Sequence, residues 1–170
     1  MSTTKQDERL QEAGKGAMAS IREMVAALEC DYERLEELRD ERDGWEPDEE
    51  GPQSWAEANP GDAEELKELE ESAGECKDQE EARERILEDA LSLEFRSGWV
   101  TNWEDVEKEE YCLLLTTGGP AVRIIGEVRN GEAYSARLEV QDWGTPWTEH
   151  ITTGSDHEAL LDYALCFCME

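Results

Sequence analysis

The chain has 170 residues, and its 45 acidic side chains against 16 basic ones give a formal net charge of −29 at neutral pH. Lys and Arg are nowhere clustered, which excludes direct binding to DNA, RNA or an anionic membrane, because these surfaces require groups of cations. No apolar run approaches the roughly 20 residues of a membrane span, and residues 1–10 lack the apolar core of a signal peptide, so we expect a cytoplasmic protein.

The first part of the chain has a helical pattern. Residues 1–16 are expected to be a flexible N-terminus, followed by a helix over Ala17–Arg42 in which apolar residues recur at spacings of three and four, as in a coiled coil. The members of this apolar seam are Met18, Ile21, Val25, Leu28, Tyr32 and Leu35. The prolines and glycines of residues 43–61 predict a connector.

A second helix is expected to begin at Asp62, which with Glu65 resembles a capping box. The apolar seam of this helix is weakest at Gly74, and its members are Leu66, Leu69, Ala73, Cys76, Ala82, Ile86 and Ala90. The two helices predict an acidic, coiled-coil-like hairpin over residues 17–90. One apolar stripe per helix buries little surface, so the hairpin has to pack on the rest of the chain or on a second copy, which leaves a homodimer open.

From Leu91 the apolar period changes to two, which is typical of strands. Strands are expected at residues 91–95, 111–116, 121–128 and 133–140, with a tight turn at Asn130-Gly131 because both residues tolerate positive φ. A helix over residues 155–169, with Asp156 as its N-cap, would cover one face of the sheet. The expected fold class is therefore α+β, with residues 91–170 forming a four-stranded antiparallel sheet and a C-terminal helix.

Candidate catalytic and metal-binding groups are few. His150 and His157 would need carboxylate ligands from Glu149 or Glu158, and surface or helix-start positions are the expected roles of both histidines. Gly118-Gly119-Pro120 lacks the Lys-Ser/Thr of a phosphate loop and predicts a turn. The cysteines are odd in number, have no CxxC spacing and are expected to be free thiols: Cys30, Cys76, Cys112, Cys166 and Cys168. We expect no enzyme, no metal site and no cofactor.

One cluster of strand-end residues has enzyme-like chemistry. Its members are Arg96, Arg123, Arg137 and Asp142. A catalytic role would require these side chains to converge in one pocket, and the alternation along the strands does not establish that they do.

Charge density is the strongest feature of the chain. Asp40–Glu81 carries 18 acids and 3 bases, and Asp62–Glu75 alone has seven acids against Lys67, a net charge of −6. In a helix with a rise of about 1.5 Å per residue, that is roughly one charge per 3.5 Å, close to the phosphate spacing of about 3.4 Å along a DNA strand. A basic groove built for nucleic acid would accept such a surface. The ordinary alternative is a solvated, solubilising helix face.

Three C-terminal segments carry a resemblance: LSLEFRSGW at residues 91–99, TGGPAVRI at 117–124 and ARLEVQDWGTPWTE at 136–149. They resemble a family of acidic proteins carried on plasmids, prophages and integrative elements of proteobacteria. The resemblance implies a genomic setting and brings no activity or catalytic residue. Small acidic proteins of that setting include DNA mimics that block restriction enzymes and CRISPR effectors, an argument by analogy.

Two hypotheses follow. In the first, the protein is an anti-CRISPR or anti-restriction protein of a phage or mobile element, acting in the host bacterial cell, and its acidic hairpin occupies the groove of a basic nucleic-acid-binding effector. The expected partner-binding residues are Glu33, Glu36, Glu37, Asp40, Glu64, Glu65, Glu68 and Glu71. In the second, the protein is a non-enzymatic interaction module whose sheet binds the partner through Trp99, Trp143 and Trp147, and the hairpin serves solubility or dimerisation.

Overall fold

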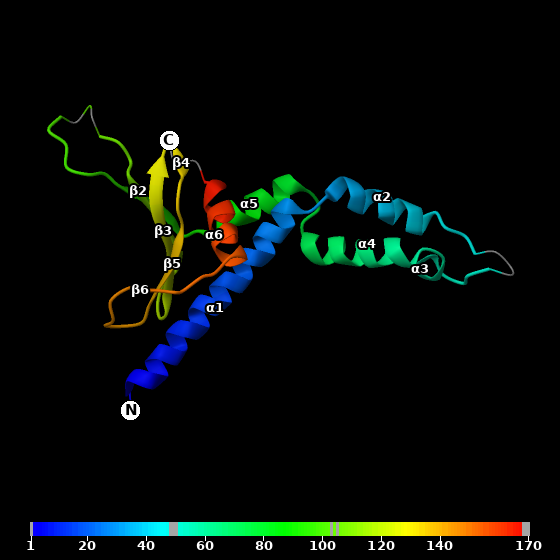
Figure 1. Ribbon diagram of the computed structural model, residues 1–170, viewed down its shortest axis with the longest axis horizontal. Helices are drawn as coiled ribbons and strands as arrows, with labels where there is room; N and C mark the ends of the chain where they lie inside the picture. The colour runs from blue at the N-terminus through cyan, green and yellow to red at the C-terminus, as the bar shows by residue number, and fades with distance from the viewer. Residues whose placement is uncertain (1, 48–50, 103, 105, 168–170) are drawn as a thin grey trace. The chain divides into compact units, whose positions relative to one another are not determined.

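The computed structural model describes residues 2–47, 51–102, 104 and 106–167 (Figure 1). It contains helices and an open antiparallel sheet, which confirms the α+β class. The helices are α1 (Ser2–Glu29), α2 (Tyr32–Asp43), α3 (Trp55–Ala58), α4 (Pro60–Ala73), α5 (Gln79–Asp89) and α6 (Ser155–Leu165). The strands are β1 (Ser92–Arg96), β2 (Glu110–Thr116), β3 (Ala121–Arg129), β4 (Glu132–Ala133), β5 (Arg137–Gln141) and β6 (Thr148–Glu149). Within the described ranges, every helix is too short or too polar to cross a bilayer.

The chain divides into two compact units, residues 1–25 with 84–170 and residues 26–83. This differs from the expected division into residues 17–90 and 91–170. Met18 and Ile21, which the expected seam placed in the hairpin, belong to the first unit and are buried. Residues 2–16, expected to be flexible, are part of α1. Within this stretch Leu10 is buried and Gly14 lies directly against His150, so residues of the unit that contains the sheet hold it in place.

The sheet of the first unit is antiparallel, in the order β1-β2-β3-β5-β6, and β4 pairs with β3. Strands β1, β2 and β3 lie where the alternation predicts them. The turn at Asn130-Gly131 is confirmed, because φ is 53° at Asn130 and 79° at Gly131. The expected number of four strands is wrong, because the short β6 is an additional strand and the strand expected at residues 133–140 is interrupted.

A bulge at residues 134–136 separates β4 from β5, and the register with β3 shifts by one residue across it. The backbone of Ser135 passes very close to Gly126. A Cβ added to Gly126 would lie 1.8 Å from the Ser135 carbonyl oxygen. The Tyr111 hydroxyl donates to the same oxygen at 2.8 Å. A continuous strand was the wrong prediction because a tertiary hydrogen bond and a glycine on the neighbouring strand favour the bulge.

One face of the sheet is packed and the other is open. Side chains of β2, β3 and β5 alternate between buried and partly exposed positions, and α6 and the N-terminal part of α1 lie on the buried side (Figure 1). The largest fully buried side chains of this unit are Met18, Ile21, Ile86, Tyr111, Leu113, Ile124, Leu138, Leu160 and Tyr163. The open face carries polar side chains, which form one of the candidate sites below.

Ion pairs hold α1 against the sheet loops and α6. Arg9 pairs with the buried carboxylate of Asp142 at 3.1 Å, and Arg22 bonds to Asp156 at 2.6 Å. The hydrogen bond from Arg22 lowers the pKa of Asp156 below its usual value. Asp156 was expected to be the N-cap of the C-terminal helix, but the N-cap is Gly154, and Asp156 lies in the first turn with its side chain bonded to Arg22.

The second unit is a helical hairpin of α2 and α4. Leu35 and Leu38 of α2 form a buried cluster with Leu66 and Ala73 of α4. This replaces the expected pairing of one helix over residues 17–42 with another over residues 62–90. The apolar spacing correctly placed Leu35, Leu66 and Ala73 in the core, but it missed Leu38 and did not identify where the helices end.

Local capping explains these boundaries. The first predicted helix is interrupted after Glu29, and Asp31 caps α2 by accepting a hydrogen bond from the Arg34 backbone N–H at 3.0 Å. The capping box expected at Asp62 is also wrong, because α4 begins at Pro60 with Asn59 as its N-cap. Proline suits the first helical position, which needs no N–H donor.

The connector between α2 and α4 contributes to the core of the hairpin. Trp55 is buried there and Trp45 packs against the same cluster. Trp55 begins the short helix α3, whose N-cap Ser54 accepts a hydrogen bond from the Glu57 backbone N–H at 3.2 Å. The spacing of Ser54 and Glu57 is the sequence signal that could have predicted this helix.

Candidate functional site

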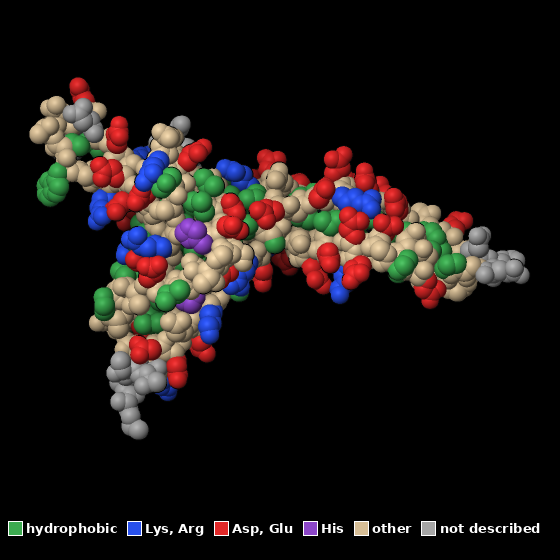
Figure 2. Space-filling view, viewed as in Figure 1, with side chains coloured by type: hydrophobic (Ala, Val, Ile, Leu, Met, Phe, Trp, Pro, Cys, Tyr) green, Lys and Arg blue, Asp and Glu red, His purple; other side chains and the backbone are tan. Residues whose placement is uncertain are grey.

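Negative charge is concentrated in the second unit. Residues 26–83 hold 23 of the 45 acidic side chains and 6 of the 16 basic ones, a net charge of −17, whereas the remainder of the chain has a net charge of −12. Acidic side chains gather over α2 and α4 in the space-filling view (Figure 2). Because the second unit is also the shorter of the two, its net charge per residue is more than twice that of the first.

The acidic side chains of the hairpin lie on two outer faces. Each helix turns its buried stripe toward the other helix, so the opposite faces of α2 and α4 point away from each other. The exposed acids on the outer face of α2, here called the α2 row, are Glu33, Glu36, Glu37 and Asp40. The exposed acids on the outer face of α4, here called the α4 row, are Glu64, Glu68 and Glu71.

Arginines lie at the seam between the two helices. Arg34 of α2 pairs with Glu65 of α4 at 3.0 Å, and Arg39 and Arg42 approach Glu70 at 3.2 and 3.6 Å. Hydrogen bonding to Glu65 is the main cause that raises the pKa of Arg34. All three arginines of α2 thus reach carboxylates of the seam, and Arg34 also reaches Glu37 of the α2 row.

The structure separates the eight predicted partner-binding residues into two groups. Among the described residues, no Lys or Arg lies within 4 Å of five of these carboxylates: Glu33, Glu36, Asp40, Glu64 and Glu68. Glu37 lies 3.4 Å from Arg34, and Glu71 lies 3.7 Å from Lys67. Glu65 differs from all of these because it belongs to the seam, where it binds Arg34 across the hairpin.

The spacing within the α2 row is similar to that of phosphates. The four carboxylates of the α2 row extend from Glu33 to Asp40, about 10 Å along the axis at about 1.5 Å per residue, which is roughly one charge per 3.5 Å. The three carboxylates of the α4 row cover the same length, from Glu64 to Glu71, so they lie roughly 5 Å apart along the axis, and Lys67 lies among them. The two helix axes of a packed pair are about 8–10 Å apart. The hairpin thus presents two outward rows of negative charge on a narrow rod, as a duplex presents two phosphate strands.

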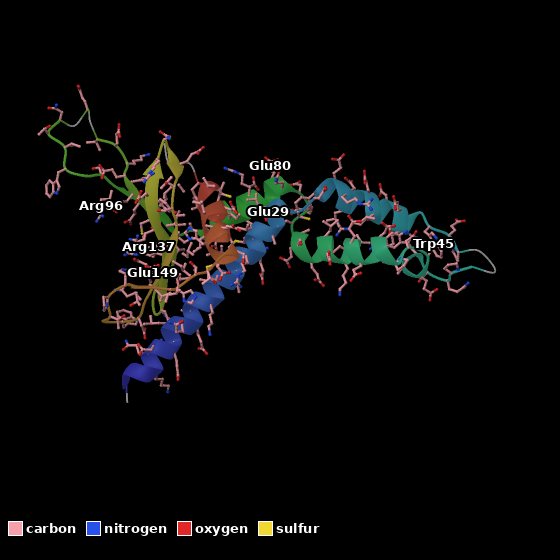
Figure 3. All side chains as sticks on the ribbon, viewed as in Figure 1. Glu29, Trp45, Glu80, Arg96, Arg137 and Glu149 are labelled. Carbon is pink, nitrogen blue, oxygen red and sulfur yellow. The ribbon has the colours of Figure 1, made fainter. Side chains whose placement is uncertain are left out.

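The open face of the sheet holds a second candidate site, a pocket of about 410 Å³. Arg96, Arg123 and Arg137 all line this pocket, and Figure 3 labels two of them on the side of the sheet away from α6. The strand register therefore brings together three arginines that sequence reasoning could not place. Asp142, the fourth member of that cluster, lies elsewhere and is buried against Arg9.

Each arginine of the pocket is paired with a carboxylate. Arg96 pairs with Glu110 across β1 and β2. Arg123 donates to one oxygen of Glu139 at 2.9 and 2.7 Å, and Arg137 donates to the other oxygen at 3.4 Å. Because acids and bases alternate, the pocket suits a ligand or partner surface with both charges better than a simple anion.

The described residues contain no cluster of His, Cys, Asp and Glu that could hold a metal ion. Burial raises the pKa of Cys112 in the sheet pocket, which favours the thiol over the nucleophilic thiolate. His150 is buried beside Gly14, and His157 is exposed. The free cysteines of the described chain are Cys30, Cys76, Cys112 and Cys166, and Cys168 lies outside the described residues.

The three tryptophans of the second hypothesis do not form one site. Trp99 follows β1 at one edge of the sheet and is 106 % exposed, whereas Trp143 and Trp147 lie between β5 and β6 at the other edge. Trp143 is 80 % exposed. The Trp147 ring is covered by the Arg123 guanidinium, whose central carbon lies 4.1 Å from the ring centroid. The aromatic surface is therefore divided between two sheet edges.

No protein family model, curated protein or solved structure matches this chain. The resemblance to acidic proteins of mobile elements therefore stays a prediction from three segments of the sequence.

Proposed function

We propose that this chain is an anti-defence protein of a phage or mobile element, which inhibits a host restriction enzyme or CRISPR effector by occupying its nucleic-acid groove. The observation that carries the proposal is the pair of outer rows on the α2–α4 hairpin, whose carboxylates are exposed and, on α2, have a phosphate-like spacing. A groove lined by Lys and Arg for duplex DNA meets negative charge from both rows. Its complementary potential accelerates encounter with such a surface.

The seam contacts of the hairpin support the same mechanism. Leu38 is completely buried and Trp55 packs in the same cluster, while Arg34 and Glu65 join α2 to α4. These contacts hold both helices in place before a partner arrives, so little conformational freedom is lost on binding. The hairpin then excludes DNA sterically and electrostatically, and inhibition is competitive with DNA.

A defence assay with matched charge variants tests the proposal. Phage plating or plasmid establishment is measured in cells that carry a restriction or CRISPR system, with and without the protein. The α2-row variant is E33Q/E36Q/D40N, the α4-row variant is E64Q/E68Q/E71Q, and the control is E12Q/E132Q/E149Q, which neutralises three exposed acids of the first unit. The wild type and the control are expected to suppress defence, and both row variants to lose most of this effect. Row variants as active as the wild type contradict the proposal.

A second candidate function is a non-enzymatic interaction module that binds its partner on the open face of the sheet. The specific observation in its favour is the pocket in which Arg96, Arg123 and Arg137 converge. In this case Arg137→Ala and Trp147→Ala are expected to abolish the biological effect. The first removes a side chain that lines the pocket, and the second removes the ring on which Arg123 stacks. The row variants are then expected to keep the effect, so the same assay separates the two functions.

A further inference from the structure

Strand β1 forms one edge of the sheet and lies within a segment rich in exposed apolar side chains. Within the described part of the chain, β1 pairs with β2 only. More than half of the large apolar side chains that are exposed in the described chain lie in this short segment: Leu87, Leu91, Phe95, Trp99, Val100 and Val106. An exposed sheet edge with apolar side chains is a template for another strand, and such patches mark interaction surfaces.

The charges of β1 indicate which strand fits this edge. Glu94 and Arg96 flank Phe95, and both project to the open face of the sheet, since their partners on β2 are Cys112 and Glu110. A segment with an acid and a base placed symmetrically about one residue, as Glu94 and Arg96 are about Phe95, is complementary to itself when two copies run antiparallel. The C-terminal end of β1 therefore fits the same end of a second β1, with residues 94–96 of each strand opposite one another.

We propose that β1 pairs with β1 of a second copy of this chain, antiparallel and with Phe95 on the two-fold axis. In this register Glu94 faces the partner's Arg96, and Arg96 faces the partner's Glu94. Phe95 faces the partner's Phe95. The two open faces then join in one continuous sheet, and the interface goes beyond the proposed function of the hairpin.

Neighbouring registers are less favourable. The nearest registers that keep both open faces on the same side pair each residue with a partner residue two positions away from its proposed one. In one of them Glu94 lies opposite the partner's Glu94, and in the other Arg96 lies opposite the partner's Arg96. Like charges in direct opposition destabilise a strand pair. The proposed register also brings Leu91 toward the partner's Trp99 at each end. These two side chains are 58 % and 106 % exposed in the single chain, so the pairing covers them.

The intramolecular contact of Arg96 is compatible with this pairing. Arg96 is bonded to Glu110 on β2, and a guanidinium has five N–H donors, so it can bond to a second carboxylate without losing the first. A pair of strands as short as β1 is small for an interface, and we expect a weak dimer whose population depends on protein concentration.

Sedimentation equilibrium of the full chain over a concentration series tests the proposal. The wild type is expected to reach about twice the chain mass of 19.3 kDa. Glu94→Arg and Arg96→Glu are each expected to remain at the mass of a single chain, because each places like charges opposite one another twice. An equimolar mixture of these two variants is expected to form a heterodimer, since two basic side chains of one then face two acidic side chains of the other.

The mixture also controls for folding, because only folded variants can form the heterodimer. Glu149→Arg, a charge reversal on the opposite edge strand β6, is the matched control and is expected to dimerise like the wild type. The proposal is overturned by a wild type that stays at a single chain mass, by single variants that still dimerise, or by a mixture that does not associate. A dimer disrupted by Glu149→Arg also overturns it and points to the β6 edge.

Discussion

A tight contact between Gly14 of α1 and His150 illustrates how single residues set the fold of the first unit. A Cβ added at Gly14 would lie 2.3 Å from Nδ1 of His150. Glycine within a helix ordinarily lowers stability by about 1 kcal/mol relative to alanine. The close approach of the imidazole ring explains why position 14 is a glycine, because no larger side chain fits there.

We expect Gly14→Ala to lower the free energy of unfolding by about 1–3 kcal/mol, because the ring or the helix has to move. Gly16→Ala is the matched control, since a Cβ there meets no atom within 4 Å. This control should raise the free energy of unfolding by up to about 1 kcal/mol. Urea unfolding of both variants measures the difference, and equal effects would contradict this explanation of Gly14.

His150 also makes the stability of this unit depend on pH. Its Nδ1 is buried without a hydrogen-bond partner among the described atoms, and burial lowers its pKa below the ordinary 6.5, with Lys15 lowering it further and Asp156 opposing both. The unfolded chain therefore takes up a proton at a higher pH than the folded chain. By linkage, the free energy of unfolding falls as the pH decreases below about 6.5.

The test is urea unfolding at several pH values between about 7 and 5. His150→Phe keeps an aromatic ring but cannot titrate, so we expect a flatter pH profile of the free energy of unfolding. His157→Gln, at an exposed position, serves as the control and should keep the profile of the wild type. A His150→Phe profile as steep as that of the wild type would show that other groups cause the pH dependence.

Among the elements, the α2–α4 hairpin is a compact unit with its own core. Leu38 has no exposed surface, so Leu38→Ala is expected to lower the stability of the hairpin by about 2–4 kcal/mol. Native-state hydrogen exchange should show the loss of protection mainly in residues 26–83. Leu69→Ala, at a partly buried position of the same cluster, should have a smaller effect. An equal loss of protection over both units would contradict the division of the chain.

The elements also show what the sequence can predict. Period-two alternation identified β1, β2 and β3, and Asn130-Gly131 identified the turn after β3, because these signals act over a few residues. The end of α1 and the bulge before β5 were missed. They depend on the cap at Asp31 and on the close passage of Ser135 over Gly126, which a periodicity pattern does not contain.

The sequence predicts the parts of the candidate sites that depend on local structure, but not the parts that depend on how the elements pack. Helical periodicity predicts that the acids of the two rows are exposed, since they lie opposite the apolar stripes. The bond between Arg34 and Glu65 depends on how α2 packs against α4. The convergence of Arg96 and Arg137 depends on the register of β1, β2, β3 and β5 in the sheet, which the sequence pattern left open.

For the whole molecule, the uneven distribution of its net charge of −29 predicts salt-sensitive binding to a partner. The α4-row variant E64Q/E68Q/E71Q should bind more weakly than the wild type, and its affinity should also depend less steeply on salt concentration, because fewer charges face the partner. The control variant E12Q/E132Q/E149Q should keep the slope of the wild type. Binding measured across a salt series checks this, and affinities that do not depend on salt would favour the sheet pocket instead.

The most direct test of DNA mimicry is competition between this protein and duplex DNA for one host partner. Immobilised wild-type protein and the α4-row variant are exposed to bacterial lysate at low salt, and retained proteins are challenged with short duplex DNA. If the hairpin mimics DNA, the wild type retains a nucleic-acid-binding effector, duplex DNA releases this effector, and the row variant retains much less of it. A partner that excess DNA does not release, or one that the wild type and the row variant retain equally, would contradict DNA mimicry.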